Sequence, residues 1–350
     1  MRNFHSERPG RGSQCAQRGQ MEYDAKERCC GWCYGTGATM KCAKCPRAYC
    51  SRECQVRDWK AGRHKTWCGR AGEKCVDYEV RDAGAKGLGL FARRDFQRGE
   101  KILVERAVAT QPGPGRPVDW RQLENTETRR ATLALAPAGS SDLDEIFLQN
   151  AAELGDEDDD AGSGLFVNFS RANHDCLGNS AHYWDPDLGL KLLVANCHIP
   201  AGTEITFSYA CKKNSLERVF AMSLRGFQCG CLACRTPDLA AKLDRALELD
   251  KKVAELTYHG RTEQAIRAGK NLLGLYDELQ SSDRERVRTY YDLFQAAIAK
   301  KKTVAQGAKF IKEGHKCALR FYGREENEEV RKQARYASNP SLHRNYRCIN

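Results

Sequence analysis

The cysteines of this sequence stand at spacings that suit metal ligands. The chain has 18 cysteines among 350 residues, and its first residues are not the apolar segment that directs secretion. Thiols stay reduced inside cells, where closely spaced pairs bind zinc more readily than they form disulfides. We therefore expect an intracellular protein, in the nucleus, the cytoplasm or both, in which 11 of the 18 cysteines bind zinc.

Four ligand pairs lie within residues 30–68. Each pair can sit on one turn of chain and direct two ligands at one metal ion, so the segment can complete two tetrahedral zinc sites. A segment this short has few apolar side chains to bury, and metal binding would supply its free energy of folding. The eight candidate ligands are Cys30, Cys33, Cys42, Cys45, Cys50, Cys54, His64 and Cys68.

A third zinc site requires two parts of the chain that are far apart in the sequence. A C-x-C-x-x-C cluster at residues 229–234 supplies three thiolates, and Cys176 supplies one. Neither part alone offers the four ligands of a closed site, whereas together they do. We predict a third zinc ion, which would attach the later segment to the earlier one. Its ligands would be Cys176, Cys229, Cys231 and Cys234.

Three further motifs accompany these ligands. Residues 87–92 read GLGLFA, residues 173–176 read NHDC and residues 203–209 read TEITFSY. In this order, with the cysteine cluster after them, they resemble the SET-domain lysine methyltransferases. Since the ligands of residues 30–68 resemble a MYND zinc finger, the chain is similar to the SET and MYND domain family. In better-known members the finger interrupts the SET domain, whereas here it comes first.

The resemblance implies S-adenosylmethionine as cofactor and a protein lysine as methyl acceptor. Tyr209 would be the catalytic residue, its hydroxyl orienting the acceptor amine, and Phe207 would line the lysine channel. Each position also has a plain alternative role, such as a tight turn for the glycines, a solvent-facing amide for Asn150 and a core ring for Phe207. The implied cofactor-binding residues are Lys86, Gly87, Leu88, Asn150, Asn173, His174, Tyr209 and Phe227.

Two positions depart from the family pattern. Asp175 stands where serine is usual, and Gly178 stands where proline is usual. Neither change removes an implied ligand or catalytic group.

The resemblance also divides the finger ligands into two interleaved sets. In the family such fingers are associated with proline-rich partner peptides and sometimes with DNA, and a purely structural finger is the alternative. One zinc ion would be held by Cys30, Cys33, Cys50 and Cys54, and the other by Cys42, Cys45, His64 and Cys68.

The expected fold class is α+β, with a SET-domain β-fold, a zinc finger and a C-terminal helical domain. Strands are expected at 78–81 and 101–105, forming the opening hairpin with 98–100 as its turn. From Leu239 onwards apolar residues recur at helical spacing, which predicts four to five helices, TPR-like on the resemblance. Residues 258–262 (YHGRT) predict a break at the glycine and an N-cap at Thr262.

These observations divide the chain into five expected units. They are a disordered tail at 1–28, a MYND-type zinc finger at 29–69, a SET domain at 76–210, a post-SET zinc segment at 211–236 and a helical domain at 238–340. The SET domain would carry a helical insert at about 118–155 and an acidic loop at 153–160. The acidic loop is most simply a solvated surface loop. The more specific alternative is that it forms a rim that attracts basic protein tails.

The formal net charge of +11 suits an acidic partner such as chromatin, although a solvated basic surface is the simpler explanation. No apolar run is long enough to span a bilayer. We expect a monomer, without membrane association, that methylates histone tails or other basic protein segments. Two alternatives stay open: a catalytically silent adaptor that recruits partners, and a zinc-dependent regulator that binds nucleic acid.

Overall fold

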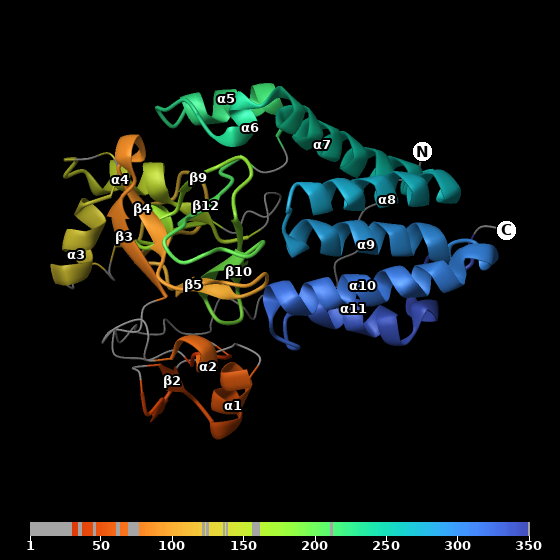
Figure 1. Ribbon diagram of the computed structural model, residues 1–350, viewed down its shortest axis with the longest axis horizontal. Helices are drawn as coiled ribbons and strands as arrows, with labels where there is room; N and C mark the ends of the chain where they lie inside the picture. The colour runs from red at the N-terminus through yellow and green to blue at the C-terminus, as the bar shows by residue number, and fades with distance from the viewer. Residues whose placement is uncertain are drawn as a thin grey trace.

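The computed structural model describes residues 30–33, 37–44, 47–60, 64–68, 77–120, 123, 126–135, 137, 139–155, 162–210 and 213–348. A small cysteine-rich unit, here called the finger (residues 30–68), precedes a region of β-sheets, and a stack of helices completes the chain (Figure 1). The tail expected at 1–28, the candidate ligand Cys45 and residues 156–160 of the expected acidic loop lie outside the described residues.

A buried polar cluster joins the elements of the finger. The Tyr49 hydroxyl donates to Asp58 Oδ2 at 2.7 Å and lies 2.6 Å from His64 Nδ1. Arg47 pairs with Asp58 at 2.8 Å and reaches Asp77, at the start of the β-region, at 3.8 Å. Asp58 therefore fixes the candidate ligand His64, and Arg47 attaches the finger to the β-region. The elements are β1 (Met40–Lys41), β2 (Ala48–Tyr49), α1 (Arg52–Lys60) and α2 (His64–Trp67).

The first hairpin differs from the one expected from the sequence. β3 (Tyr78–Asp82) pairs with β4 (Leu88–Ala92), and the 3-10 turn η2 (Gly84–Lys86) joins them. The GLGLFA motif is thus itself a strand, because Leu90 and Ala92 alternate into the core. The prediction that residues 78–81 pair with residues 101–105 is wrong. The short turn around η2 closes the nearer pair, and β5 (Lys101–Glu105) joins another sheet.

The central sheet brings distant motifs together. Its strand order is β3-β4-β12-β9, with β12 (Glu204–Phe207) antiparallel to β4 and parallel to β9 (Asn173–His174). In the parallel pair Thr206 lies opposite Asn173 and Phe207 opposite His174. The NHDC and TEITFSY motifs therefore lie side by side.

A second sheet has the strand order β10-β11-β5. Two of its strands, β10 and β11, lie between residues 176 and 203, where the sequence analysis predicted no strand. The sheet pairs β10 (Ser180–Asp185) with β11 (Leu190–Ala195), and β11 with β5. All six residues of β11 are buried. Leu193 and Ala195 pack in the β-region core, whereas Leu190, Leu192 and Val194 pack with Phe321 of the helices. β11 thus belongs to two cores.

The third sheet carries the helices of the insert. Its strands are β6 (Ala109–Gln111), β8 (Ser163–Leu165) and β7 (Ala152–Glu153), in that order. Within the insert lie α3 (Thr126–Leu133) and α4 (Leu143–Asn150). Asp142 caps α4, accepting hydrogen bonds from the backbone N–H groups of Asp144 and Glu145.

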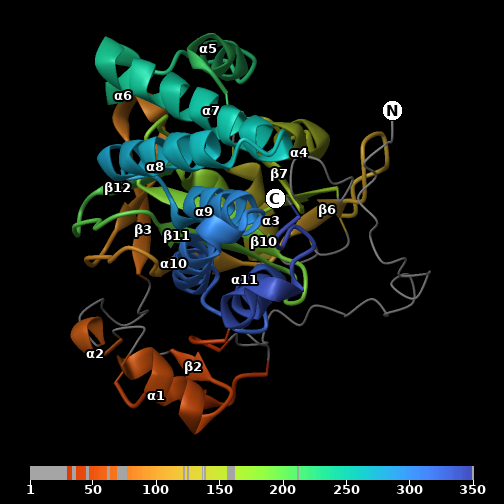
Figure 2. The same cartoon turned by 90° about the vertical axis from the view of Figure 1, so that its right-hand side faces the viewer.

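Five longer helices form the C-terminal stack (Figures 1 and 2). The break at residues 258–262 falls where it was predicted. Thr262 is not the cap, however, because it is the first helical residue and its hydroxyl donates to Ala296 O at 3.2 Å. The helices are α7 (Pro237–Tyr258), α8 (Thr262–Glu278), α9 (Asp283–Ile298), α10 (Val304–Tyr322) and α11 (Glu328–Ser338), with 3-10 turns η5 (Lys301–Thr303) and η6 (Pro340–Leu342).

Ion pairs of two buried aspartates join the stack to the β-region. Asp283 at the start of α9 pairs with Arg98 at 2.8 Å, and Asp185 on β10 pairs with Arg324 at 2.7 Å. Two short helices, α5 (Ser215–Ser223) and α6 (Leu232–Arg235), lie on the opposite side of the sheets from the finger in both views (Figures 1 and 2). Within the described ranges, no helix combines the length and apolarity needed to cross a membrane.

Candidate active site and zinc sites

The segment after β9 crosses over β12 in close contact. Asp175 N–H donates to Phe207 O at 3.2 Å, and the Ser180 hydroxyl donates to Thr206 O at 2.7 Å. The Gly178 N–H closes the turn on Asp175 O at 3.0 Å, a bond that proline could not make. Glycine at this position therefore serves the turn as well as the close approach to β12.

Tyr209 comes after β12 and is held at both ends. Its N–H donates to His174 Nδ1 at 3.0 Å, and its hydroxyl donates to Ala172 O at 2.7 Å. Burial raises the pKa of Tyr209 to about 12, so the phenol keeps its proton at neutral pH. With that proton directed at Ala172 O, the oxygen lone pairs are left to accept a hydrogen bond.

His174 connects Tyr209 to the cysteine cluster. Burial, aided by the charge of Arg225, lowers the pKa of His174 to about 4, so the ring is neutral. Nδ1 accepts the Tyr209 N–H, so the ring proton sits on Nε2, which lies 3.4 Å from Cys176 Sγ. A metal-bound thiolate at Cys176 would accept that proton as a hydrogen bond.

The turn that joins β3 to β4, here called the glycine turn (residues 83–87), lies beside Asn173. The Asn173 amide donates to Leu88 O at 3.2 Å and to Glu204 Oε1 at 2.8 Å, and Lys86 pairs with Glu204 at 2.8 Å. Gly87 has φ 75°, and a Cβ there would meet nothing within 4 Å. The backbone of the turn thus borders open space, as a ligand cradle requires.

The end of α4 borders the same region. The Asn150 amide donates back to Ile146 O at 2.8 Å, and the Ser170 hydroxyl, which donates to Phe166 O at 2.7 Å, lies 3.2 Å from Asn150 O. Asn150 therefore lies near the NHDC motif, although its amide group donates to a carbonyl of its own helix.

Phe207 and Phe227 occupy different environments. Phe207 is buried, with ring centroids 4.8 Å from Phe169, 5.0 Å from His182 and 4.9 Å from Tyr209. Phe227 is more exposed, and its ring lies 6.1 Å from that of His174. Phe207 is thus a core ring that also adjoins Tyr209, and Phe227 lies at the edge of the site.

The structure adds two residues that the sequence analysis did not single out. Glu105 is a half-buried residue whose carboxylate accepts the backbone N–H groups of Asn168 and Phe169 at 2.8 to 3.1 Å. Burial raises its pKa despite these bonds. Arg225 lies with its guanidinium carbon 5.1 Å from the centre of the Tyr209 ring and donates to Gln149 O at 3.4 Å. No motif marks either residue.

Among the residues that the structure describes, three groups of candidate ligands have side-chain ligand atoms within 4.8 Å of one another. A tetrahedral site with Zn–S bonds of about 2.3 Å places sulfur atoms about 3.8 Å apart. The sulfurs are 3.5 Å apart for Cys33 and Cys50, 3.4 Å for Cys42 and Cys68, and 3.6 Å for Cys176 and Cys234. These distances exclude disulfides and suit a shared zinc ion.

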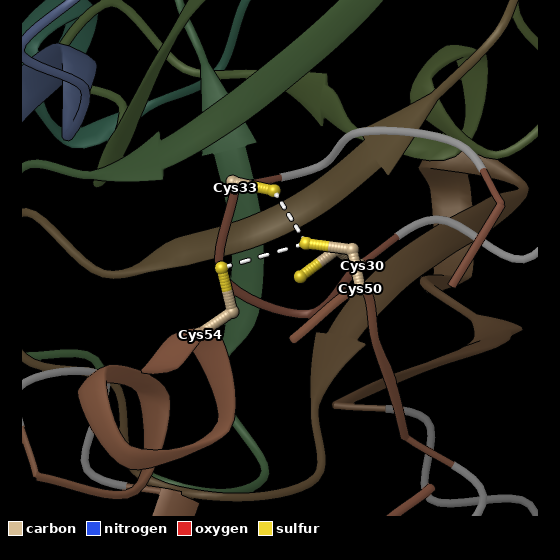
Figure 3. Close-up of side chains that lie close together, drawn as sticks. All are labelled: Cys30, Cys33, Cys50 and Cys54. Carbon is tan, nitrogen blue, oxygen red and sulfur yellow. Dashed lines mark hydrogen bonds between the residues drawn. The ribbon is translucent and has the colours of Figure 1, made fainter. Parts of the chain in front are cut away.

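The grouping matches the interleaved pattern expected from the sequence. Figure 3 shows the first set, in which the four sulfurs converge. The second set contains three described members, since Cys45 lies outside the described residues. The third set joins Cys176 to the cluster at the start of α6. The sets are Cys30, Cys33, Cys50 and Cys54; Cys42, His64 and Cys68; and Cys176, Cys229, Cys231 and Cys234.

Residues 87–210 match the family model described as the SET domain, and this part of the chain is a SET domain. Over 283 residues the chain is 24% identical to histone-lysine N-methyltransferase set5 of Schizosaccharomyces pombe, covering 76% of this chain and 85% of that relative. It is also similar to the crystal structure of a Plasmodium falciparum protein proposed to be a histone methyltransferase. There the identity is 13% and the TM-score 0.26, over 39% of this chain and 95% of that one.

Proposed function

We propose that this protein is an S-adenosylmethionine-dependent protein-lysine N-methyltransferase that acts on histone tails or other basic protein segments. One observation carries the proposal: within a SET domain, the β9–β12 pair holds Tyr209 against His174, next to the glycine turn. The name of the Schizosaccharomyces pombe relative, a histone-lysine N-methyltransferase, supports it.

The residues around the turn suit a cofactor with amine, carboxylate and aromatic parts. The backbone at Gly87 borders open space, which would let Lys86, Gly87 and Leu88 approach S-adenosylmethionine closely. Phe227, at the edge of the site, offers an apolar face to the cofactor's adenine. The remaining proposed contacts come from Asn150, Asn173, His174 and Tyr209.

The bound cofactor would supply a methyl group on a positively charged sulfur. The acceptor lysine must arrive unprotonated, although a free lysine has a pKa of about 10.4. Burial and neighbouring positive charge both disfavour the ammonium form, and Arg225 is such a charge. The Tyr209 oxygen, whose proton is directed at Ala172 O, would accept an amine N–H and so orient the nitrogen lone pair.

We further propose three zinc ions, one for each ligand set, with Cys45 completing the second set. The third zinc would hold residues 229–234 on Cys176 and thereby support His174 and Phe227. The finger would be of MYND type and bind proline-rich peptides, and the helical domain would be TPR-like and form one wall of the substrate cleft. We place the protein in the nucleus, the cytoplasm or both, as a monomer.

The test uses the full chain with isotopically labelled S-adenosylmethionine, core histones and cell extract, with mass spectrometry to map labelled lysines. Tyr209→Phe should lower the rate about a hundredfold while cofactor affinity stays close to that of the wild type. Loss of the bond to Ala172 O should also lower stability by about 1 kcal/mol. The matched control is Tyr258→Phe, which changes an exposed tyrosine at the end of α7. Equal rates for wild type and Tyr209→Phe would refute the assigned role.

A further inference from the structure

The helix α5 presents an apolar face to solvent. Leu216, Val219, Phe220 and Leu224 recur at helical spacing and are 82%, 57%, 64% and 70% exposed. Such a stripe normally packs against the protein's own core. In both views α5 lies at the outer edge of the molecule (Figures 1 and 2). An exposed apolar face of this kind marks an interaction surface.

The opposite face of α5 fixes the helix in this orientation. Arg218 is buried there and donates to Asp244 of α7 at 3.1 Å, and Met222 is fully buried. Asn214 and Glu217 form a capping box at the start of the helix. Turning the apolar stripe inward would break the Arg218–Asp244 pair and expose Met222. These buried contacts therefore keep the stripe exposed to solvent.

One end of the apolar face lies beside the proposed active site. Directly after Leu224, Arg225 contacts the Tyr209 ring and donates to Gln149 O of α4. Next to Gln149, Leu148 is 83% exposed. Leu148 of α4 and Leu224 at the end of α5 thus each lie one residue from the Arg225–Gln149 contact beside Tyr209.

The charge around this face is positive. Lys213, Arg225 and Arg235 are exposed and form no ion pair with any residue that the structure describes. The nearest acidic group on α5, Glu217, accepts the Asn214 N–H in the capping box. A partner segment with apolar and acidic side chains would therefore complement both the apolar character and the positive charge of this surface.

Resting on the proposed function, we propose that α5 and Leu148 form the docking surface for the protein that supplies the acceptor lysine. The segment that lies on α5 would carry at least one bulky apolar residue and an acidic residue near that lysine. The acceptor would thus be bipartite, with its lysine at Tyr209 and its anchor on α5. A basic segment that lacks both residues would bind more weakly than a basic segment that carries them.

The test compares full-length variants in the labelling assay. Leu216→Ser combined with Phe220→Ser removes apolar surface, and Lys213→Glu reverses one charge. The control, Leu342→Ser, changes another exposed leucine on η6, away from the site. We expect both α5 variants to lower kcat/KM for labelled proteins, about tenfold for the double variant, with unchanged melting temperature and cofactor affinity. The control should match the wild type.

Peptides from a mapped acceptor site provide the second measurement. Replacing their apolar and acidic residues by serine should lower kcat/KM about tenfold for the wild type and little for the α5 double variant. Equal efficiencies of wild type and α5 variants on the labelled proteins would overturn the docking inference alone. A wild type that labels no protein would overturn the proposed function, and the inference with it. If the variants abolish a dimer in sedimentation or binding to lipid vesicles while labelling stays unchanged, α5 serves a second copy or a membrane instead.

Discussion

Replacing Gly178 by alanine should damage the site without touching a ligand or a catalytic group. Gly178 lies where the segment after β9 crosses β12. A Cβ added there would lie 2.5 Å from Phe207 Cα and 2.8 Å from Thr206 O. Carbon atoms normally approach to about 3.5–4.0 Å, so the two backbones would have to separate by about 1 Å.

Neither backbone can move freely. The turn is closed by Gly178 N–H on Asp175 O and by the Asn196 amide on Gly178 O at 3.1 Å. On the other side, β12 is paired with both β4 and β9. Overpacking typically costs about 1–3 kcal/mol, and contact between two fixed backbones puts this variant near 3 kcal/mol. A chain of this size should then melt about 5 °C lower.

The assay combines thermal melting with calorimetry of S-adenosylmethionine binding. Displacement of β12 should also shift His174 and Tyr209, so we expect affinity to fall about tenfold. The matched control is Gly274→Ala on α8, where a Cβ would meet nothing within 4 Å. Removing glycine from a helix interior should stabilise the protein by up to about 1 kcal/mol. If Gly178→Ala melts with the wild type and binds the cofactor equally well, the crossing is not rigid and the reasoning fails.

The site supports three further predictions. Elemental analysis should find three zinc ions per chain, and Cys229→Ser should lose one of them and weaken cofactor binding because Phe227 loses its support. Glu105→Gln should lower the free energy of unfolding in urea by about 2 kcal/mol, since the amide cannot accept all the N–H bonds that the carboxylate accepts. Phe207→Tyr should shift products toward monomethyl-lysine in peptide mass spectra, because its hydroxyl would narrow the proposed lysine channel. An unchanged product ratio with activity retained would place the limit on methylation elsewhere.

The groups of candidate metal ligands could be predicted from the sequence more fully than the pairing of strands could. A two-residue spacing fixes the geometry of a ligand pair locally, and a count of four ligands is enough to join Cys176 to residues 229–234. Strand partners depend instead on which turn closes first. Strands expected at 78–81 and 101–105 would leave the GLGLFA motif in the connection between them, and only the pairing of β3 with β4 shows that it is a strand.

The residues that escaped the sequence analysis act through contacts that no local pattern records. Glu105 resembles any polar end of a strand, and its importance comes from N–H groups at 168–169 that would otherwise have no acceptor. Arg225 reaches Tyr209 only because the fold places the end of α5 beside α4. The stripe on α5 has the spacing of a core-facing helix, and only the burial of Arg218 and Met222 shows that the helix faces the other way.

The two-sided burial of β11 has a consequence for how the molecule can be divided. A fragment that ended at residue 236 would keep the SET domain but would expose Leu190, Leu192 and Val194, which pack with Phe321. Three aliphatic side chains on one face of the middle strand of a sheet form an apolar surface that favours aggregation in water. The half that carries the SET domain should therefore aggregate when expressed without its helices, and it should remain soluble when the two halves are produced together. By the same reasoning, heat should melt the two halves in a single transition.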